Sequence, residues 1–142
     1  MTEVCSHIVL VEDELSDATF MRKALERGAM QHEVVVVETA AKFFAYLETS
    51  FVENRPPDLV LLDLSLPAMS GLDVLRAVRS GDQWPLVPVI VLTSSSYRLE
   101  IAEAYAAGAN AFVTKPARLA DLDSFVAQIE AFWLGTAHLP YR

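Results

Sequence analysis

The stretch DLVLLDLSLP, residues 58–67, is the part of the chain that most directly indicates the fold. Four apolar residues run without alternation into Asp63. A continuous apolar run of this kind is typical of a strand whose two faces are both covered, as in a parallel sheet. Because an ionised carboxylate at a buried strand end is costly unless it is paired, we also expect a compensating partner beside Asp63.

Five short β-rich runs of this type alternate with longer segments in which apolar residues recur at helical spacing. The expected strands are 7–11, 33–38, 58–63, 87–93 and 110–114. The expected helices are 14–28, 39–49, 72–79, 99–108 and 117–134. Right-handed crossovers turn this pattern into a single α/β domain of (βα)5 type, with a flavodoxin-like parallel sheet of strand order 2-1-3-4-5.

The composition limits the classes of function. The chain has 142 residues, of which 53% are hydrophobic, so it is long enough and apolar enough for one globular domain. Its 19 acidic and 11 basic side chains give a net charge of −8, which argues against direct binding of nucleic acid. The sequence has no stretch that suggests a signal peptide or a membrane span. A single cysteine, Cys5, excludes an internal disulfide and suits the cytoplasm.

Polar side chains follow the expected strands at their carboxyl ends, where ligands bind in open parallel sheets. Glu12 and Asp13 follow the first strand, Asp63 ends the third, Thr93 ends the fourth and Lys115 follows the fifth. Since the first and third strands are neighbours in the expected order, their three carboxylates should converge on one pocket. Oxygen ligands of this kind favour a hard cation such as Mg²⁺.

A strand-end carboxylate beside a cation can also act as a nucleophile toward a phosphoryl group and form an aspartyl phosphate. Catalysis of phosphoryl transfer consists largely of positioning and charge stabilisation. Mg²⁺, the Lys115 ammonium and the Thr93 hydroxyl would meet the phosphoryl oxygens on different sides. The residues alone therefore indicate phosphoryl chemistry at Asp63.

Four blocks of sequence resemble the receiver domains of bacterial two-component response regulators, the CheY-like family. The blocks are VEDE at 11–14, DLVLLDLSLPAMSGLDVL at 58–75, VIVLTSSS at 89–96 and AGANAFVTKP at 107–116. They occur in the family's order over nearly the whole chain.

The resemblance implies a role for each residue of the acidic cluster. Asp63 would be the phosphoacceptor. Glu12, Asp13, Asp63 and the backbone carbonyl of Ser65 would hold Mg²⁺. The acidic pair here is Glu-Asp, whereas Asp-Asp is commoner in the family, so one arm of the metal site is longer but keeps its charge.

The resemblance also implies roles for the ends of the last two strands. Thr93 and Lys115 would contact the phosphoryl group, and Phe112 would occupy the position of the family's switch aromatic, acting together with Thr93. Phe112 lacks the hydroxyl of the Tyr often found there, so a switch would depend on ring packing. The family further implies a cis peptide between Lys115 and Pro116, and cis bonds occur almost only before proline.

The segment QIEAFWLGTAHLP, residues 128–140, resembles the ending of the stand-alone response regulators that work with bacterial and cyanobacterial phytochromes. This implies a sensor histidine kinase of phytochrome type as the partner. We expect a receiver domain over 1–134 and a tail over 135–142, with no output domain before the chain ends at Arg142.

A second apolar stripe on the last expected helix favours a homodimer built on that helix and the tail. It consists of Phe125, Phe132 and Leu134, which lie off the face assigned to the core, and Trp133 adjoins it. Large exposed apolar patches usually mark interfaces. The alternative is an extended core that the tail covers.

We therefore expect a cytoplasmic single-domain response regulator, a phosphorylation switch that catalyses only its own phosphorylation and dephosphorylation. A relay that passes the phosphoryl group on to a histidine phosphotransfer domain stays open. A haloacid-dehalogenase-type phosphatase would need a second acid where Ser65 stands, and a dinucleotide-binding module would need a GxGxxG motif after the first strand. His7, His32 and His138 are expected at the surface or at strand edges, without a catalytic role.

Overall fold

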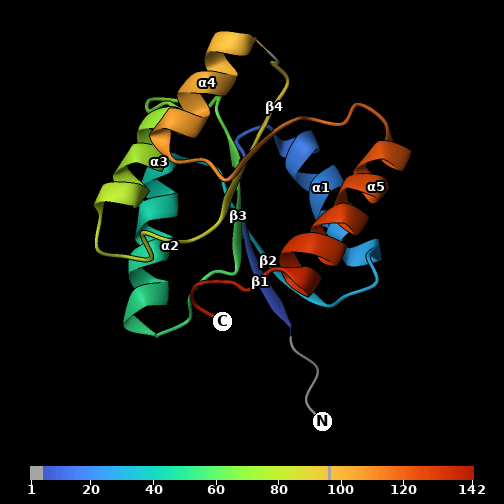
Figure 1. Cartoon of the computed structure of the whole chain (residues 1–142), viewed down its shortest axis with the longest axis horizontal. Helices are drawn as coiled ribbons and strands as arrows, with labels where there is room; N and C mark the ends of the chain where they lie inside the picture. Colours follow the sequence, from blue (N-terminus) through green and yellow to red (C-terminus); the bar gives the residue numbers. More distant parts are fainter. Residues whose placement is uncertain (1–4, 96) are drawn as a thin grey trace.

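The computed structural model describes residues 5–95 and 97–142. It contains a five-stranded parallel sheet of order β2-β1-β3-β4-β5, which confirms the expected α/β fold (Figure 1). The strands are β1 (Ser6–Val11), β2 (His32–Val37), β3 (Leu59–Asp63), β4 (Val89–Thr93) and β5 (Ala111–Thr114). The helices are α1 (Leu15–Arg27), α2 (Ala40–Val52), α3 (Gly71–Ser80), α4 (Arg98–Ala107) and α5 (Leu119–Ala131).

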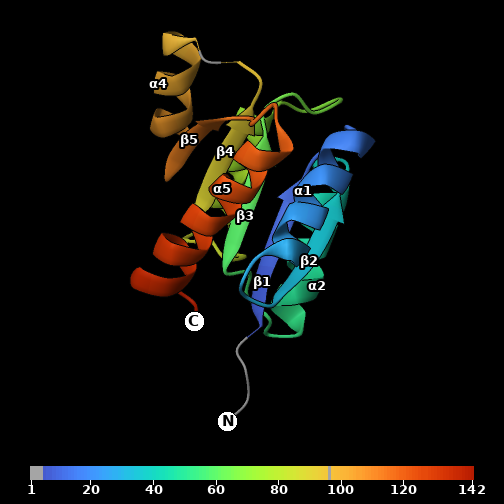
Figure 2. The ribbon, with the colours of Figure 1, turned by 90° about the vertical axis from the view of Figure 1, so that its right-hand side faces the viewer.

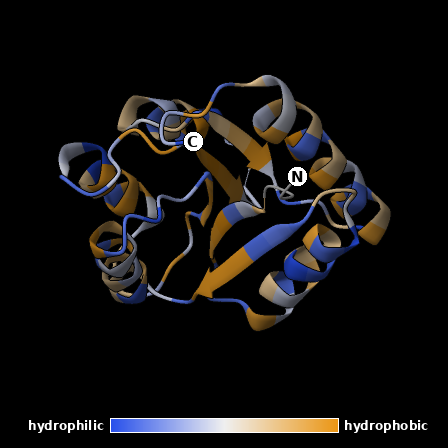
Figure 3. Cartoon of the chain, turned by 90° about the horizontal axis from the view of Figure 1, so that it is seen from below, coloured by the Kyte–Doolittle hydropathy of each residue, from blue (hydrophilic) through white to orange (hydrophobic). Residues whose placement is uncertain are grey.

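Helices cover both faces of the sheet. Helices α1 and α5 lie on one face, and α2, α3 and α4 lie on the other (Figures 1 and 2). Alternate residues of one strand enter different cores: Leu59 and Leu61 of β3 pack toward α1 and α5, whereas Val60 and Leu62 pack toward the opposite helices. Both kinds of position are apolar, which explains why the strand sequences do not alternate. Figure 3 shows the largely hydrophobic strands between helices that carry hydrophilic residues on their outer sides.

The N-terminus of α3 is tightly fitted against the end of β3. Its N-cap Ser70 accepts a hydrogen bond from the backbone N–H of Asp73. A Cβ atom at Gly71 would lie 2.5 Å from the carbonyl oxygen of Asp63, so only glycine allows this approach. The helix thereby fixes the backbone just after Asp63.

Helix α4 sits on the sheet through small side chains. Its buried residues are Ala104 and Ala107, while Leu99 and Tyr105 are exposed. Gly108 ends the helix with a φ of 111°, a left-handed conformation that glycine adopts without strain. The helix is therefore anchored mainly near its C-terminal end.

The end of α5 differs from the sequence prediction. After Ala131 the chain continues as a π-helical turn, Phe132–Thr136. Phe125 and Leu134 are each only 8% exposed and belong to the core between α1, α5 and the sheet, so their assignment to an exposed stripe is wrong. Because α5 packs against both α1 and the sheet, its buried face is wide, and the π turn shifts the phase of the residues that follow. Phe132 is 52% exposed, and Trp133 is half-buried.

The C-terminal tail crosses from one core to the other (Figure 1). Leu139 packs against the core of α1 and α5, whereas Tyr141 packs against the core on the opposite face. The Tyr141 ring lies 5.0 Å from that of Trp84, and its hydroxyl accepts a hydrogen bond from the Leu86 N–H. The tail therefore connects α5 to the loop before β4.

His7 is buried in the interior strand β1, so the expectation that it lies at the surface or at a strand edge is wrong, whereas His32 begins the edge strand β2 and is half-buried, in line with that expectation. The neighbouring helices cover the two strand beginnings. The Nε2 atom of His7 lies 2.5 Å from the Tyr46 hydroxyl of α2, and that of His32 lies 2.7 Å from a carboxylate oxygen of Glu130 in α5. His138 is exposed.

Within residues 5–95 and 97–142, the helices are too short or too polar to cross a membrane.

Candidate functional site

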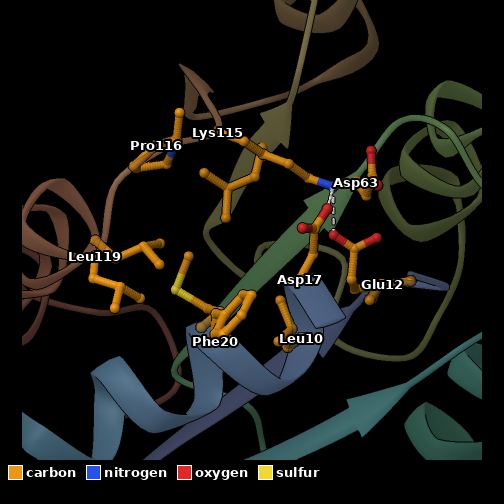
Figure 4. A pocket seen from close by; sticks show the side chains of 13 residues that line it. Leu10, Glu12, Asp17, Phe20, Asp63, Lys115, Pro116 and Leu119 are labelled. Carbon is orange, nitrogen blue, oxygen red and sulfur yellow. Dashed lines mark hydrogen bonds and ion pairs between the residues drawn. The ribbon is translucent and has the colours of Figure 1, made fainter. Parts of the chain in front are cut away.

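Two of the carboxylates expected at the strand ends, those of Glu12 and Asp63, meet at the Lys115 ammonium group (Figure 4). Lys115 follows β5, Glu12 follows β1, and Asp63 ends β3. The Nζ atom of Lys115 lies 2.5 Å from Glu12 Oε1 and 2.8 Å from Asp63 Oδ2. This ion pair is the compensation that the buried strand-end carboxylate requires.

Asp13 completes an acidic cluster beside this ion pair. One carboxylate oxygen from each of Glu12, Asp13 and Asp63 lies within 4.8 Å of the others. Glu12 and Asp63 are buried, whereas Asp13 is exposed to solvent. An all-oxygen donor set that is partly open to water fits Mg²⁺, which keeps several of its water ligands.

Glu12 and Asp63 respond in opposite directions to this environment. Burial, reinforced by the hydrogen bond with Asp63, raises the pKa of Glu12 to about 7 even though Lys115 opposes the shift. Burial also disfavours ionisation of Asp63, but hydrogen bonds from Glu12, Lys115 and the Ser65 N–H outweigh it and lower the Asp63 pKa. Asp63 is therefore the ionised member of the pair.

Lys115 remains a cation for the same reason. Burial disfavours its charge, but the hydrogen bonds with Asp63, Glu12 and Asp17 outweigh the burial and raise the pKa of Lys115. An ammonium group is thus held permanently next to the Asp63 carboxylate.

Ser65 contacts the Asp63 carboxylate through its backbone. Its backbone N–H donates a hydrogen bond of 3.0 Å to Asp63 Oδ1. That bond orients the carboxylate and leaves Oδ2 for Lys115. Ligation of a metal by the Ser65 carbonyl stays a prediction.

Thr93 is linked to Lys115 through the backbone. Its carbonyl accepts a hydrogen bond of 2.7 Å from the Lys115 N–H, and its side chain is buried. The Thr93 hydroxyl accepts a long hydrogen bond of 3.4 Å from the Ser95 N–H. Thr93 therefore lies at the carboxyl edge of the sheet, and its hydroxyl is bonded to the loop that leads to α4.

Phe112 lies in β5, half-buried against the core of α2, α3 and α4. Its backbone N–H donates a hydrogen bond of 3.2 Å to the Tyr105 hydroxyl of α4. The predicted switch aromatic is thus tied directly to α4.

The peptide bond between Lys115 and Pro116 is trans, because no cis peptide bond occurs in the part of the chain that the structure describes. The predicted cis peptide is therefore corrected. The trans form of a bond before proline is the more stable one by about 0.5–1 kcal/mol.

A cavity of about 340 Å³ opens beside the ion pair, between α1 and the start of α5. Glu12, Asp17, Asp63 and Lys115 form its polar end. Its remaining lining is apolar and includes Leu10, Val11, Phe20, Met21, Leu92, Pro116, Ala117, Leu119 and Leu122.

Asp17 is the site residue that the sequence analysis missed. Its Oδ2 atom lies 2.9 Å from Lys115 Nζ. The available signal was an acidic residue in the first turn of the helix that directly follows Glu12 and Asp13.

Comparison with known proteins agrees with this geometry. The response regulator Rcp1 of Synechocystis sp. is 35% identical over 135 residues, an alignment that covers 94% of this chain and 92% of Rcp1. The crystal structure of the phosphorylated cyanobacterial phytochrome response regulator RcpA is 37% identical, with a TM-score of 0.87 over 96% of this chain and 99% of RcpA. The Mn²⁺-bound form of Rcp1 gives a TM-score of 0.81 at 34% identity, over 95% and 99% of the two chains.

The family description "Response regulator receiver domain" matches residues 8–127, a range that includes all five strands except the first two residues of β1. The same range contains Glu12, Asp63 and Lys115. The chain therefore belongs to the response regulator receiver domain family.

Proposed function

We propose that this receiver domain accepts a phosphoryl group on Asp63 from a sensor histidine kinase. The observation that carries the proposal is the position of the Lys115 ammonium, 2.8 Å from Asp63 and beside the cluster of Glu12, Asp13 and Asp63. An ionised strand-end carboxylate between a cation and a metal-binding cluster is suited to phosphoryl chemistry.

In the transfer step, a carboxylate oxygen of Asp63 forms a bond to phosphorus. The bond between phosphorus and the histidine nitrogen of the donor breaks, and that nitrogen keeps the electron pair. Lys115 and the Thr93 hydroxyl stabilise the charge on the phosphoryl oxygens. Thr93 reaches this role by a shift of its side chain from Ser95.

Glu12, Asp13, Asp63 and the Ser65 carbonyl are the residues that would hold Mg²⁺. When bound, the ion supplies positive charge to the phosphoryl oxygens. The Mn²⁺-bound form of the relative Rcp1 supports a divalent ion in a protein of this kind.

A phytochrome-type kinase is the proposed donor, because the relatives include a cyanobacterial phytochrome response regulator. We place the reaction in the cytoplasm, where such kinases present their phosphohistidine. The net charge of −8 favours protein partners over direct contact with nucleic acid. Beyond its own phosphorylation and dephosphorylation, the domain would act as a binding switch and not as an enzyme.

The proposed switch runs from Asp63 to the outer surface of α4. Movement of Thr93 toward a phosphoryl group would pull the loop before α4, and Phe112 would repack because its N–H is bonded to Tyr105 of that helix. Phosphorylation then shifts the populations of two surface states.

Incubation of the chain with a small phosphodonor and Mg²⁺, followed by intact mass measurement, tests the proposal. We expect the wild type to gain one phosphoryl group and Asp63→Asn to gain none. Asp58→Asn is the matched control, because Asp58 is a buried carboxylate at the opposite end of β3 and should leave the gain intact. Phosphorylation of Asp63→Asn, or none in the wild type, would contradict the proposal.

The kinase assignment needs a second experiment. We expect a phytochrome-type histidine kinase, labelled with phosphate, to transfer its label to the wild type. Onward transfer to a histidine phosphotransfer domain would identify a relay instead of an end point.

A further inference from the structure

The Lys115 ammonium is saturated by three carboxylates. An ammonium group has three hydrogens to donate. The Nζ atom lies 2.5 Å from Glu12, 2.8 Å from Asp63 and 2.9 Å from Asp17 (Figure 4). Each hydrogen therefore has one carboxylate as its acceptor.

Asp17 differs from the other two partners in its surroundings. Glu12 and Asp63 belong to the cluster whose oxygens could hold a metal, and Asp17 is not part of that cluster. The Asp17 side chain is 45% exposed, whereas the side chains of Glu12 and Asp63 are 4% and 6% exposed. Asp17 therefore stands at the mouth of the cavity, between solvent and Lys115.

The charges around the mouth do not balance. Three carboxylates, of Glu12, Asp17 and Asp63, contact the single ammonium of Lys115, and Asp13 adds a fourth carboxylate beside Glu12 and Asp63. When all are ionised, a divalent cation still leaves one excess negative charge. Asp17 supplies that charge from outside the metal cluster, and its removal would make the loaded site neutral.

Asp17 is not needed to keep Lys115 in place. The ammonium retains two buried acceptors, Glu12 and Asp63, and the backbone of Lys115 is fixed by its hydrogen bond to the Thr93 carbonyl. The main effect of Asp17 on the site is therefore its charge, which acts on anything negative that approaches through the mouth.

We propose that Asp17 is a specificity-determining residue whose negative charge slows capture of free anionic phosphodonors at Asp63. The inference rests on the proposed function of Asp63 as phosphoacceptor. A phosphoryl group presented by a docked protein gains binding energy from the protein surface and overcomes this repulsion. A free dianionic donor gains no such binding energy, so repulsion by Asp17 slows its capture.

The test compares phosphorylation rates of Asp17→Asn and the wild type with acetyl phosphate at saturating Mg²⁺. We expect the variant to raise the apparent second-order rate constant about threefold to tenfold at low salt, at the low end of electrostatic effects on association. The gain should shrink as ionic strength rises, because salt screens exposed charges. It should also be smaller with phosphoramidate, which carries less negative charge.

Two variants control for effects other than charge at the mouth. Asp17→Glu keeps the charge and should lie closer to the wild type than Asp17→Asn does. Asp73→Asn removes an acid from the third position of α3, the position that Asp17 has in α1, and breaks a similar ion pair with Arg76. Asp73→Asn should leave the rate unchanged.

A binding measurement gives an independent readout. Calorimetric titration with Mg²⁺ should show a dissociation constant about two- to fivefold higher for Asp17→Asn, because one negative charge near the metal-binding carboxylates is lost. Asp17→Glu should restore the affinity.

A slower Asp17→Asn variant, or a gain that does not depend on salt, would overturn the inference while leaving Asp63 as the phosphoacceptor. An unchanged Mg²⁺ affinity would also count against it. If the wild type is not phosphorylated at all, the proposed function fails, and the role of Asp17 fails with it.

Discussion

Glu12 and Asp63 lie side by side and are almost equally buried, yet only one of them is expected to keep its proton near neutral pH. The difference comes from their hydrogen bonds. Asp63 accepts from the Ser65 N–H and from Lys115, which stabilise its charge, whereas burial dominates at Glu12. Asp63 is thus ionised and ready to act as a nucleophile, because Glu12 carries the proton that the two carboxylates share.

The raised pKa of Glu12 gives a pH dependence to the stability of the chain without metal. Because the folded state binds this proton more tightly than the unfolded state, the stability contributed is fully present below pH 4.5 and is lost as pH rises through about 7. We expect the free energy of unfolding to fall over this range in EDTA, and to fall less in Glu12→Gln. Urea denaturation at several pH values measures both slopes.

Asp63 does not interfere with that measurement. Its pKa is lowered from 3.8, so its contribution is present above pH 3.8 and is lost only in more acidic solution. Equal slopes for the wild type and Glu12→Gln would show that Glu12 is not the group that titrates.

Glu130 of α5 links this helix to the loop after α1 and to the beginning of β2. Glu130 is buried and accepts hydrogen bonds from the backbone N–H groups of Ala29 and Met30 and from His32. A Cβ atom at Gly28 would lie 2.3 Å from the Glu130 carboxylate, so glycine makes room for it. The connection between α1 and β2 therefore depends on the end of α5.

We expect Glu130→Ala to lower the free energy of unfolding by about 2–4 kcal/mol, because it leaves buried donors without an acceptor. Gln128→Ala, at an exposed position of the same helix, should change it by less than about 0.5 kcal/mol. Urea denaturation of the three proteins measures these changes. A loss of similar size in both variants would mean that the effect belongs to the helix and not to the Glu130 contacts.

The elements also show what the sequence could predict. The strands were identified because helices cover both faces of the sheet, which leaves largely continuous apolar runs in the buried strands β1, β3 and β4 and also in the half-buried edge strands β2 and β5. The end of α5 was misassigned because helical periodicity of 3.6 residues does not hold through a π turn, so the inward position of Leu134 could not be recognised.

The site was predicted to the extent that it follows from topology. Glu12, Asp63 and Lys115 converge because the carboxyl ends of β1, β3 and β5 share one edge of the sheet. Asp17 escaped notice because its reach to Lys115 depends on how α1 leaves the strand, which no strand-end rule describes. The cis bond before Pro116 was expected from the family resemblance alone, and the trans bond in the structure is the form that a bond before proline intrinsically prefers.

A homodimer through the last helix and tail remains a proposal, but fewer residues are available for its interface. Phe125 and Leu134 are occupied in the core, so the exposed apolar side chain left at this end is Phe132, with half-buried Trp133 at 5.3 Å between ring centres. The tail over 135–142 passes beside it and would join the interface.

Sedimentation of Phe132→Ser measures the contribution of this surface to assembly. We expect its dimer dissociation constant to rise at least about tenfold, which corresponds to about 1.4 kcal/mol for the loss of an aromatic contact. Leu119→Ser is the control, since Leu119 is similarly exposed at the other end of α5. A dimer that weakens equally in both variants, or that persists unchanged in Phe132→Ser, would exclude the proposed interface.

The packing of α4 on the sheet through two alanines has a consequence for how such proteins diversify. Because Ala104 and Ala107 are the buried residues of α4, exposed positions such as Leu99 and Ala102 can change without disturbing the sheet or the acidic cluster, whereas Tyr105 also accepts a hydrogen bond from Phe112 of β5. Related proteins can thus acquire new binding partners at the α4 surface while keeping the same phosphorylation site. The phosphorylation site and the surface that binds partners can therefore evolve independently.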